Sequence, residues 1–229
     1  MVLLLNKFFR KKIPDYINTF IWDVDGTLYQ ETGEINQMMC KVTINYIHER
    51  TKDKREKISQ YIYDQVKKNR LLGDIVEEDY KLDKHLLAEI AEYEIDKSVF
   101  VKRNHVLVDV FDNHFAKYRH AILTNGSLKN TKKILKRIGF KKTHFSSIHT
   151  REDMGKNIKP SREAFNIVMK THNIRPSEVM MVGDSLTTDI YPAKELGMAT
   201  CFVFQQDKPG RFEKVDFVIN NPVEITKIL

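Results

Sequence analysis

The chain has 229 residues, of which 41% are hydrophobic and 30% charged, and its formal net charge is +7. These values are ordinary for a globular protein that is long enough to bury a core. Its two cysteines, Cys40 and Cys201, are too far apart in sequence to suggest a disulfide framework or a metal-binding motif. The composition therefore excludes a disulfide-stapled secreted domain and favours a reducing, cytoplasmic setting.

The amino terminus, residues 1–12, reads MVLLLNKFFRKK. Its basic residues follow the apolar run, whereas a secretory signal has them in front, and the run is too short to span a membrane. We predict an amphipathic helix that docks on the protein's own surface, and we expect no membrane partner.

Six short apolar runs predict the strands of a sheet that is buried on both faces, as parallel sheets are. They lie at residues 19–22, 120–123, 145–149, 179–182, 200–204 and 217–219. Helical patterns separate them at 127–138, which ends at Gly139, at 160–170, and in a segment that ends before Gly197. Alternating strands and helices predict a doubly wound α/β core.

One long interruption separates the first two predicted strands. Residues 34–101 contain no strand-like run, but apolar residues recur at helical spacing, as in the stripe Ile58, Ile62 and Val66. Gly73 and the acidic residues 77–79 are expected to separate two of these helices. We therefore predict a core made of residues 1–33 and 102–229, with a small helical domain inserted at 34–101.

A lysine-rich segment follows the second predicted strand, between residues 129 and 142. Ile134, Leu135 and Ile138 stand among its basic residues at helical spacing, which indicates a helix with one buried and one solvated face. Attraction of anionic substrates is the next interpretation of this charge. Nucleic acid is the least favoured partner, and none is expected.

Polar residues follow four of the predicted strands. The sequence Asp-Val-Asp-Gly-Thr at 23–27 follows the first, Thr-Asn-Gly at 124–126 the second, Lys159 the third, and Gly-Asp at 183–184, with Asp189 beyond it, the fourth. Because parallel strands direct their carboxyl ends to the same edge of a sheet, these residues are predicted to form one ligand site.

The first of these motifs suits phosphoryl transfer. A carboxylate that attacks a phosphate dianion needs a cation to offset the repulsion, and Asp23 and Asp184 offer the oxygen ligands that Mg²⁺ prefers. We predict Asp23 as the nucleophile and Asp25 as the group that protonates the leaving alkoxide and later deprotonates water. Thr27 is expected to fix the turn that aims Asp25.

The other motifs suit the binding of phosphoryl oxygens. The hydroxyl of Thr124, free amides around Asn125 and Gly126 at a helix start, and the ammonium of Lys159 are the predicted contacts. Asp189 is predicted to lie outside the set of metal ligands and to orient Lys159 or a metal-bound water.

Taken together, these residues resemble the four motifs of the haloacid dehalogenase superfamily. The resemblance runs from Thr19 through nearly the whole chain, and the insert is similar to the family's subclass I cap. It implies a Rossmann-like core, Mg²⁺ and an aspartyl-phosphate intermediate. It also implies that the backbone carbonyl of Asp25 binds the metal, and that a second aspartate at this position indicates phosphoester substrates.

The expected function is therefore hydrolysis of a small phosphorylated metabolite, either a nucleotide monophosphate or a sugar or glycolate phosphate. A phosphomutase like β-phosphoglucomutase and a non-catalytic regulatory or binding module are the alternatives. Tyr29 and Tyr46 are candidate substrate contacts, although aromatic residues at helical spacing more often belong to a core. The sequence leaves open whether the protein is a monomer or a dimer.

Overall fold

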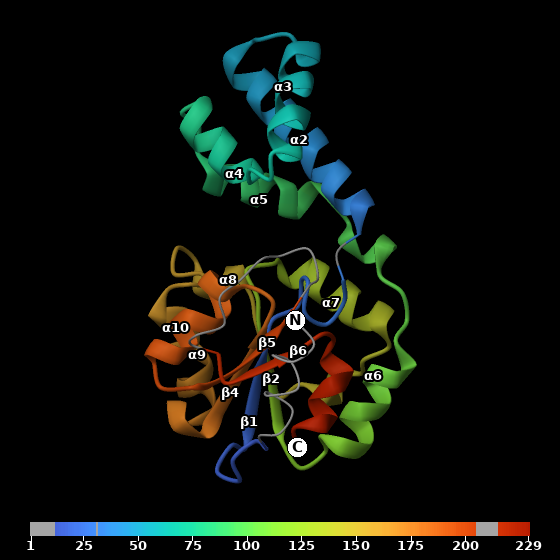
Figure 1. Ribbon diagram of the computed structural model, residues 1–229, viewed down its shortest axis with the longest axis vertical. Coiled ribbons are helices and arrows are strands. Elements are labelled where there is room, and N and C mark those ends of the chain that lie inside the picture. Colours follow the sequence, from blue (N-terminus) through green and yellow to red (C-terminus); the bar gives the residue numbers. More distant parts are fainter. Residues whose placement is uncertain (1–11, 31, 205–214) are drawn as a thin grey trace. The chain divides into compact units, whose positions relative to one another are not determined.

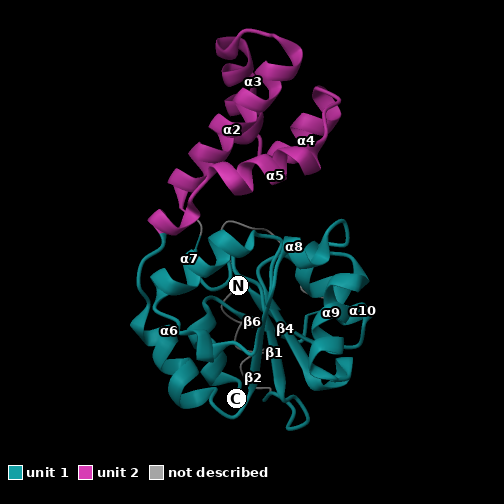
Figure 2. Ribbon diagram, turned by 180° about the vertical axis from the view of Figure 1, so that it is seen from behind, with its two compact units in different colours: residues 1–30, 101–229 teal, residues 31–100 magenta. Residues whose placement is uncertain are grey.

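The computed structural model describes residues 12–30, 32–204 and 215–229 (Figure 1). The amphipathic helix that we predicted at the amino terminus falls outside the described residues, apart from Lys12. The chain divides into two compact units, one of residues 1–30 and 101–229 and the other of residues 31–100 (Figure 2). The inserted domain was predicted at residues 34–101.

The first unit is built on a six-stranded sheet in which all neighbouring strands are parallel. The strand order is β3-β2-β1-β4-β5-β6. The strands are β1 (Thr19–Trp22), β2 (Arg119–Leu123), β3 (Ser147–His149), β4 (Val179–Gly183), β5 (Ala199–Val203) and β6 (Phe217–Ile219). Each predicted apolar run overlaps one of these strands, and the predicted α/β fold class is confirmed.

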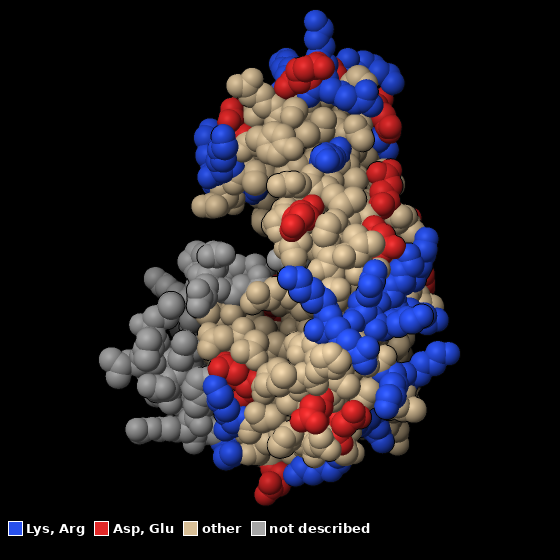
Figure 3. All heavy atoms as spheres, turned by 90° about the vertical axis from the view of Figure 1, so that its right-hand side faces the viewer, with Lys and Arg blue, Asp and Glu red and all other residues tan. Residues whose placement is uncertain are grey.

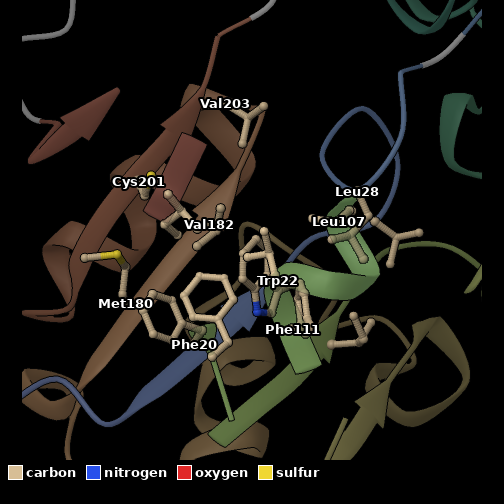
Figure 4. Close-up of a cluster of buried hydrophobic side chains, with 14 of the residues drawn as sticks. Phe20, Trp22, Leu28, Leu107, Phe111, Met180, Val182, Cys201 and Val203 are labelled. Carbon is tan, nitrogen blue, oxygen red and sulfur yellow. The ribbon is translucent and has the colours of Figure 1, made fainter. Parts of the chain in front are cut away.

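Successive strand residues point to opposite faces of the sheet and enter different clusters. On one face Phe20, Trp22 and Val182 pack with Phe111 and other helix residues (Figure 4). The helical segments of this cluster are α6 (His105–Asp109), η3 (Val110–His114), α7 (Leu128–Ile138) and η7 (Pro222–Lys227).

The other face of the sheet has its own cluster. There Ile21 and Met181 pack against Phe165 and Val168. Three helices contribute to this cluster, α8 (Arg151–Met154), α9 (Arg162–His172) and α10 (Tyr191–Glu195). The remaining helical segments described in this unit are η4 (Lys142–His144), η5 (Pro176–Glu178) and η6 (Leu186–Ile190).

A histidine lies among the aromatic side chains of the first cluster. The indole N–H of Trp22 donates to His120 Nδ1 at 3.1 Å, and His120 Nε2 lies 3.2 Å from the carbonyl of Phe115. Burial lowers the pKa of His120 to about 4. The neutral ring with its proton on Nε2 satisfies both contacts, so this histidine belongs to the core.

Helix α7 has the two faces that its sequence predicts. Ser127 caps its start by accepting from the amide of Asn130 at 3.2 Å, and Gly139 ends it with a φ of 113°. Ile134 and Ile138 are buried. The basic residues Lys129, Lys132, Lys133, Lys136 and Arg137 are exposed. Figure 3, which looks at the side that carries α6 and α7, shows lysine and arginine side chains gathered there.

Among its described residues, the second unit contains helical segments joined by short loops and no strand. Its segments are α2 (Gly33–Thr51), α3 (Arg55–Lys67), α4 (Leu72–Asp74), η1 (Ile75–Asp79), α5 (Lys84–Glu94) and η2 (Lys97–Phe100). Gly73 and residues 77–79, which we expected to separate two helices, lie between α3 and α5, and they are themselves part of the short helical segments α4 and η1. The described residues of the chain include no helix with the length and apolar character that a membrane span requires.

The second unit also has its own apolar core. Ile47, Ile58, Ile62 and Leu87 are at most 2% exposed and belong to one cluster of buried residues within this unit. Leu86 on α5, by contrast, is 38% exposed.

Candidate active site

The site lies where the order of the strands reverses. From β1 the chain continues to β2 and β3 on one side of the sheet, and it later returns to β4, β5 and β6 on the other. In such sheets the crevice at the carboxyl ends of the two central strands binds ligands. Asp23 directly follows β1, and its amide donates to the carbonyl of Val182 at 3.0 Å, while Asp184 directly follows β4.

A buried ionic network occupies this position. The ammonium of Lys159 donates to Asp23 Oδ1 at 2.7 Å and to Asp189 Oδ1 at 2.6 Å. The exposed fractions of the three side chains are 2% for Lys159, 9% for Asp23 and 1% for Asp189. Two carboxylates thus share one cation away from water, and the network carries an excess of negative charge.

The pKa values of the network follow from this arrangement. Burial disfavours the charged ammonium of Lys159, but Asp189 and Asp23 outweigh it and raise its pKa. Burial raises the pKa of Asp23 to about 6, against the lowering influence of Lys159. Lys159 therefore stays protonated at neutral pH, and a further cation at the carboxylates would be stabilised.

Three carboxylates are close enough to hold such a cation. Oxygens of Asp23, Asp184 and Asp189 lie within 4.8 Å of one another. The second oxygen of Asp189 accepts from the amide of Ser185 at 3.1 Å, so this side chain is already engaged at both ends. A set of carboxylate oxygens suits a hard divalent ion such as Mg²⁺.

The turn after β1 brings the two aspartates of the first motif into different surroundings. Gly26 has a φ of 75°, which a residue with a side chain rarely adopts. We expected Thr27 to fix the turn that aims Asp25, and its hydroxyl donates across this turn to Asp23 Oδ2 at 3.2 Å. The phenol of Tyr29 donates to Asp25 Oδ1 at 2.5 Å. Asp25 is thus oriented by a residue that we had considered only as a substrate contact.

The loop after β2 shows one departure from expectation, at Gly126, and one contact that was not predicted, at Asn125. The amide of Gly126 is not free, because it donates to the hydroxyl of Thr124 at 3.1 Å, as a threonine does when it closes a local turn. The side chain of Asn125 binds the main chain of Lys159 at both its nitrogen and its oxygen, each at 2.9 Å. The motif spacing gave no indication of this pairing.

Position 183, where the fourth motif begins, has no space for a side chain. A Cβ atom at this position would lie 2.4 Å from Asp189 Oδ2 and 2.6 Å from its Cβ. Only a residue without a side chain allows Asp189 to pass β4 so closely and reach Lys159.

Tyr46, the other candidate substrate contact, lies in the interior of the second unit. It is 2% exposed, and its hydroxyl donates to the carbonyl of Asp83 at 2.8 Å. This position favours the core interpretation that we had given to aromatic residues at helical spacing.

Known proteins with similar sequences include phosphatases. The chain is 36% identical over 76 residues to a glyceraldehyde 3-phosphate phosphatase of Pyrococcus furiosus, with 31% of each chain covered. It is 30% identical over 119 residues to a phosphoglycolate phosphatase of Vibrio parahaemolyticus, with 51% of each covered. These matches span about a third to a half of the relatives' own length.

Among solved structures, a HAD phosphatase from Thermococcus onnurineus superposes with a TM-score of 0.60 at 23% sequence identity. The superposition covers 93% of this chain and 97% of the other, and at this identity it shows a shared fold. The family description that matches the sequence, "haloacid dehalogenase-like hydrolase", applies to residues 17–197, which is well over half of the chain and contains all the site residues described above. The chain therefore belongs to the haloacid dehalogenase-like hydrolases.

Proposed function

We propose that this protein is a Mg²⁺-dependent phosphomonoester hydrolase that acts on a small phosphorylated metabolite through an aspartyl phosphate. The observation that carries the proposal is the ammonium of Lys159, held between Asp23 and Asp189 at the reversal point of the sheet. A fixed positive charge beside a buried carboxylate suits a reaction in which that carboxylate meets a phosphate dianion.

In the first step, an oxygen of Asp23 attacks phosphorus and the bond from phosphorus to the ester oxygen breaks. Lys159 and Thr27 each contact one oxygen of Asp23, so the carboxylate is held in one orientation before the substrate arrives. Asp25 gives its proton to the departing alkoxide.

In the second step, Asp25 takes a proton from water, and the hydroxide formed attacks the phosphorus of the aspartyl phosphate. The bond from phosphorus to Asp23 breaks, which releases inorganic phosphate and restores the carboxylate. The phenol of Tyr29, 2.5 Å from Asp25 Oδ1, orients Asp25 in both steps.

Asp23, Asp184 and the main-chain carbonyl of Asp25 would hold Mg²⁺. When bound, the ion supplies positive charge that offsets the repulsion between the nucleophile and the phosphate. Asp189 supports the site from outside this set by fixing Lys159.

The phosphoryl oxygens are proposed to contact Lys159, the hydroxyl of Thr124 and the main chain of Asn125, while the amide of Gly126 is already engaged by Thr124. Thr124 and Gly126 are buried beside the end of β2, and the amide of Thr124 donates to the carbonyl of His149 at 3.1 Å. This tie to the end of β3 fixes the loop in the region that the phosphate would enter.

The substrate class is proposed from the relatives, whose names refer to small monophosphates. Glyceraldehyde 3-phosphate, phosphoglycolate, a sugar phosphate and a nucleotide monophosphate form the first panel to test. We propose that residues 34–101 act as the cap that contacts the leaving group, and that the protein works in the cytoplasm without a nucleic-acid partner.

The test is phosphate release over this panel with Mg²⁺, with excess chelator and with Ca²⁺. We expect activity with Mg²⁺ alone, since Ca²⁺ is larger and less strict in its coordination. Asp184→Ala should be folded and inactive at ordinary Mg²⁺ concentration. Full turnover in chelator would refute the metal assignment, and an isomeric phosphate product without free phosphate would indicate a phosphomutase.

A further inference from the structure

We infer that Asn125 is a positioning residue for the proposed reaction: its side-chain amide fixes the main chain of Lys159 and thereby places the ammonium. The inference rests on the proposed function. It assigns the side chain of Asn125 a role different from direct contact with phosphate.

The two residues are joined by a pair of hydrogen bonds across 34 positions of sequence. Asn125 Nδ2 donates to the carbonyl of Lys159, and Asn125 Oδ1 accepts from its amide, both at 2.9 Å. The side chain thus pairs with Lys159 as a neighbouring strand residue would.

Lys159 depends on this pairing because it lies in the irregular segment between α8 and α9. Among the described residues, the two bonds from Asn125 are the only hydrogen bonds of its main chain. Lys159 is 3% exposed, so water cannot replace these partners. A buried peptide group needs such partners, and here one side chain supplies both.

Asn125 itself sits on a firmly anchored loop. The amide of Arg151 donates to the carbonyl of Gly126 at 3.2 Å, and the carboxylate of Glu152 accepts from the amide of Leu128 at 3.1 Å. The loop is therefore tied both to the end of the sheet and to the start of α8, and Asn125 extends this anchorage to Lys159.

The chemistry of the pairing requires an amide of this length. Asparagine offers a donor and an acceptor on one planar group, whereas aspartate lacks the donor and alanine lacks both. One N–H and the oxygen of the Asn125 amide are occupied by Lys159, so the role we assign to this side chain is to hold Lys159.

The test compares the full-length chain with Asn125→Ala and with a matched control, Asn166→Ala. Asn166 is also half-buried, but it lies within α9 and outside the site. We expect kcat/KM for p-nitrophenyl phosphate to fall by about 10- to 100-fold in Asn125→Ala, the size of effect that a small misplacement of a catalytic group produces. The control should stay within about twofold of the wild type, the scatter expected for a substitution away from the site.

Ligand binding separates a positioning role from general damage. Affinity for inorganic phosphate should fall at least about tenfold in Asn125→Ala, because Lys159 is displaced, while affinity for Mg²⁺ alone should not weaken. Equal loss of both affinities, or loss of neither, would overturn the inference. If Asn125→Ala does not fold, Asn125→Asp preserves the shape and one of the two bonds, and wild-type activity and phosphate affinity in that variant would equally overturn it.

A double-mutant cycle with Lys159→Met gives a further check. If Asn125 acts through the ammonium, Asn125→Ala should have little effect once that ammonium is absent. Equal effects in both backgrounds would contradict the inference. A wild type that releases no phosphate from any substrate would refute the proposed function, whereas an active wild type with a fully active Asn125→Ala would refute only the positioning role.

Discussion

The two units of the molecule differ in how completely they bury their charged side chains. In the unit of the sheet, Lys159 and its partners Asp23 and Asp189 are almost inaccessible to water. In the inserted unit the ion pairs of Arg70 with Asp79 and of Lys84 with Glu77 keep a quarter or more of at least one side chain exposed. Buried polar residues of that unit are few among those described, namely Thr43, Glu92 and Ser98.

This difference indicates that the buried charges of the sheet unit serve the proposed reaction rather than the stability of the fold. Burying charges costs desolvation free energy, and a fold that needed only stability could use apolar residues instead. The inserted unit comes closer to this, with a core of mainly apolar side chains and the pairs of Arg70 and Lys84 near its surface, although its pair of Lys97 with Glu92 is largely buried. The sheet unit retains its buried charges at the place where the proposed chemistry requires them.

The largest expected effect is loss of the nucleophile. Asp23→Asn should lower phosphate release by about 10⁴-fold or more for every substrate, because no other group forms the bond to phosphorus. The matched change in the inserted unit, Asp79→Asn, removes a surface pair and should leave turnover unchanged. Comparable losses in both variants would contradict the division between the units.

Asp25→Asn should have an effect that depends on the leaving group. An alkyl phosphate leaves as a basic alkoxide and needs the acid, so its first step should slow by about 10²–10⁴-fold. An aryl phosphate should show a burst of phenolate and then slow turnover, with phosphate trapped on Asp23. Single-turnover kinetics and mass spectrometry measure this, and equal slowing of both substrates without trapped phosphate would refute the assigned roles.

Adding a methyl group to one glycine in each unit compares the two units by steric change. Gly183→Ala forces its new methyl group against Asp189 and should lower kcat/KM by about 10- to 100-fold through displacement of Lys159. Gly73→Ala in α4 meets only the side chain of Lys84 at 3.7 Å, and alanine favours a helix there. We expect Gly73→Ala to be neutral in activity and neutral or slightly stabilising in thermal unfolding.

Removing the inserted unit tests whether it chooses the substrate. The described residues of the apolar clusters in the sheet unit include Val101 but none of residues 34–100, so replacing residues 34–100 with a short linker should leave a core that unfolds cooperatively. Hydrolysis of p-nitrophenyl phosphate should persist, while differences in kcat/KM among metabolite phosphates should shrink. An unchanged ranking of substrates would show that the insert does not select them.

The smallest effect concerns stability rather than activity. The unfolded chain protonates His120 near pH 6.5, whereas the folded protein does so only near pH 4. Between these values the unfolded state binds more protons, so the free energy of unfolding should fall as pH falls through this window, by up to about 3 kcal/mol. His120→Gln should reduce this slope in denaturant titrations, and His85→Gln on the exposed part of α5 should not.

Much of the core could be predicted from the sequence because its signals are local. Short apolar runs such as 19–22 and 179–182 predict buried strands wherever they are placed, and Gly139 marks a helix end by its own backbone freedom. The rule that parallel strands present their carboxyl ends at one edge was enough to gather Asp23, Lys159 and Asp184 into one predicted site.

The partners within that site were decided only by tertiary structure. Asn125 meets Lys159 across 34 residues, and Lys159 meets Asp23 across 136. Which hydrogen bonds these groups form depends on how closely loops from different strands approach. Motif spacing along the chain does not encode such approach, so it could name the residues of the site but not that Thr27 would contact Asp23, Tyr29 would contact Asp25, and Asn125 would hold Lys159.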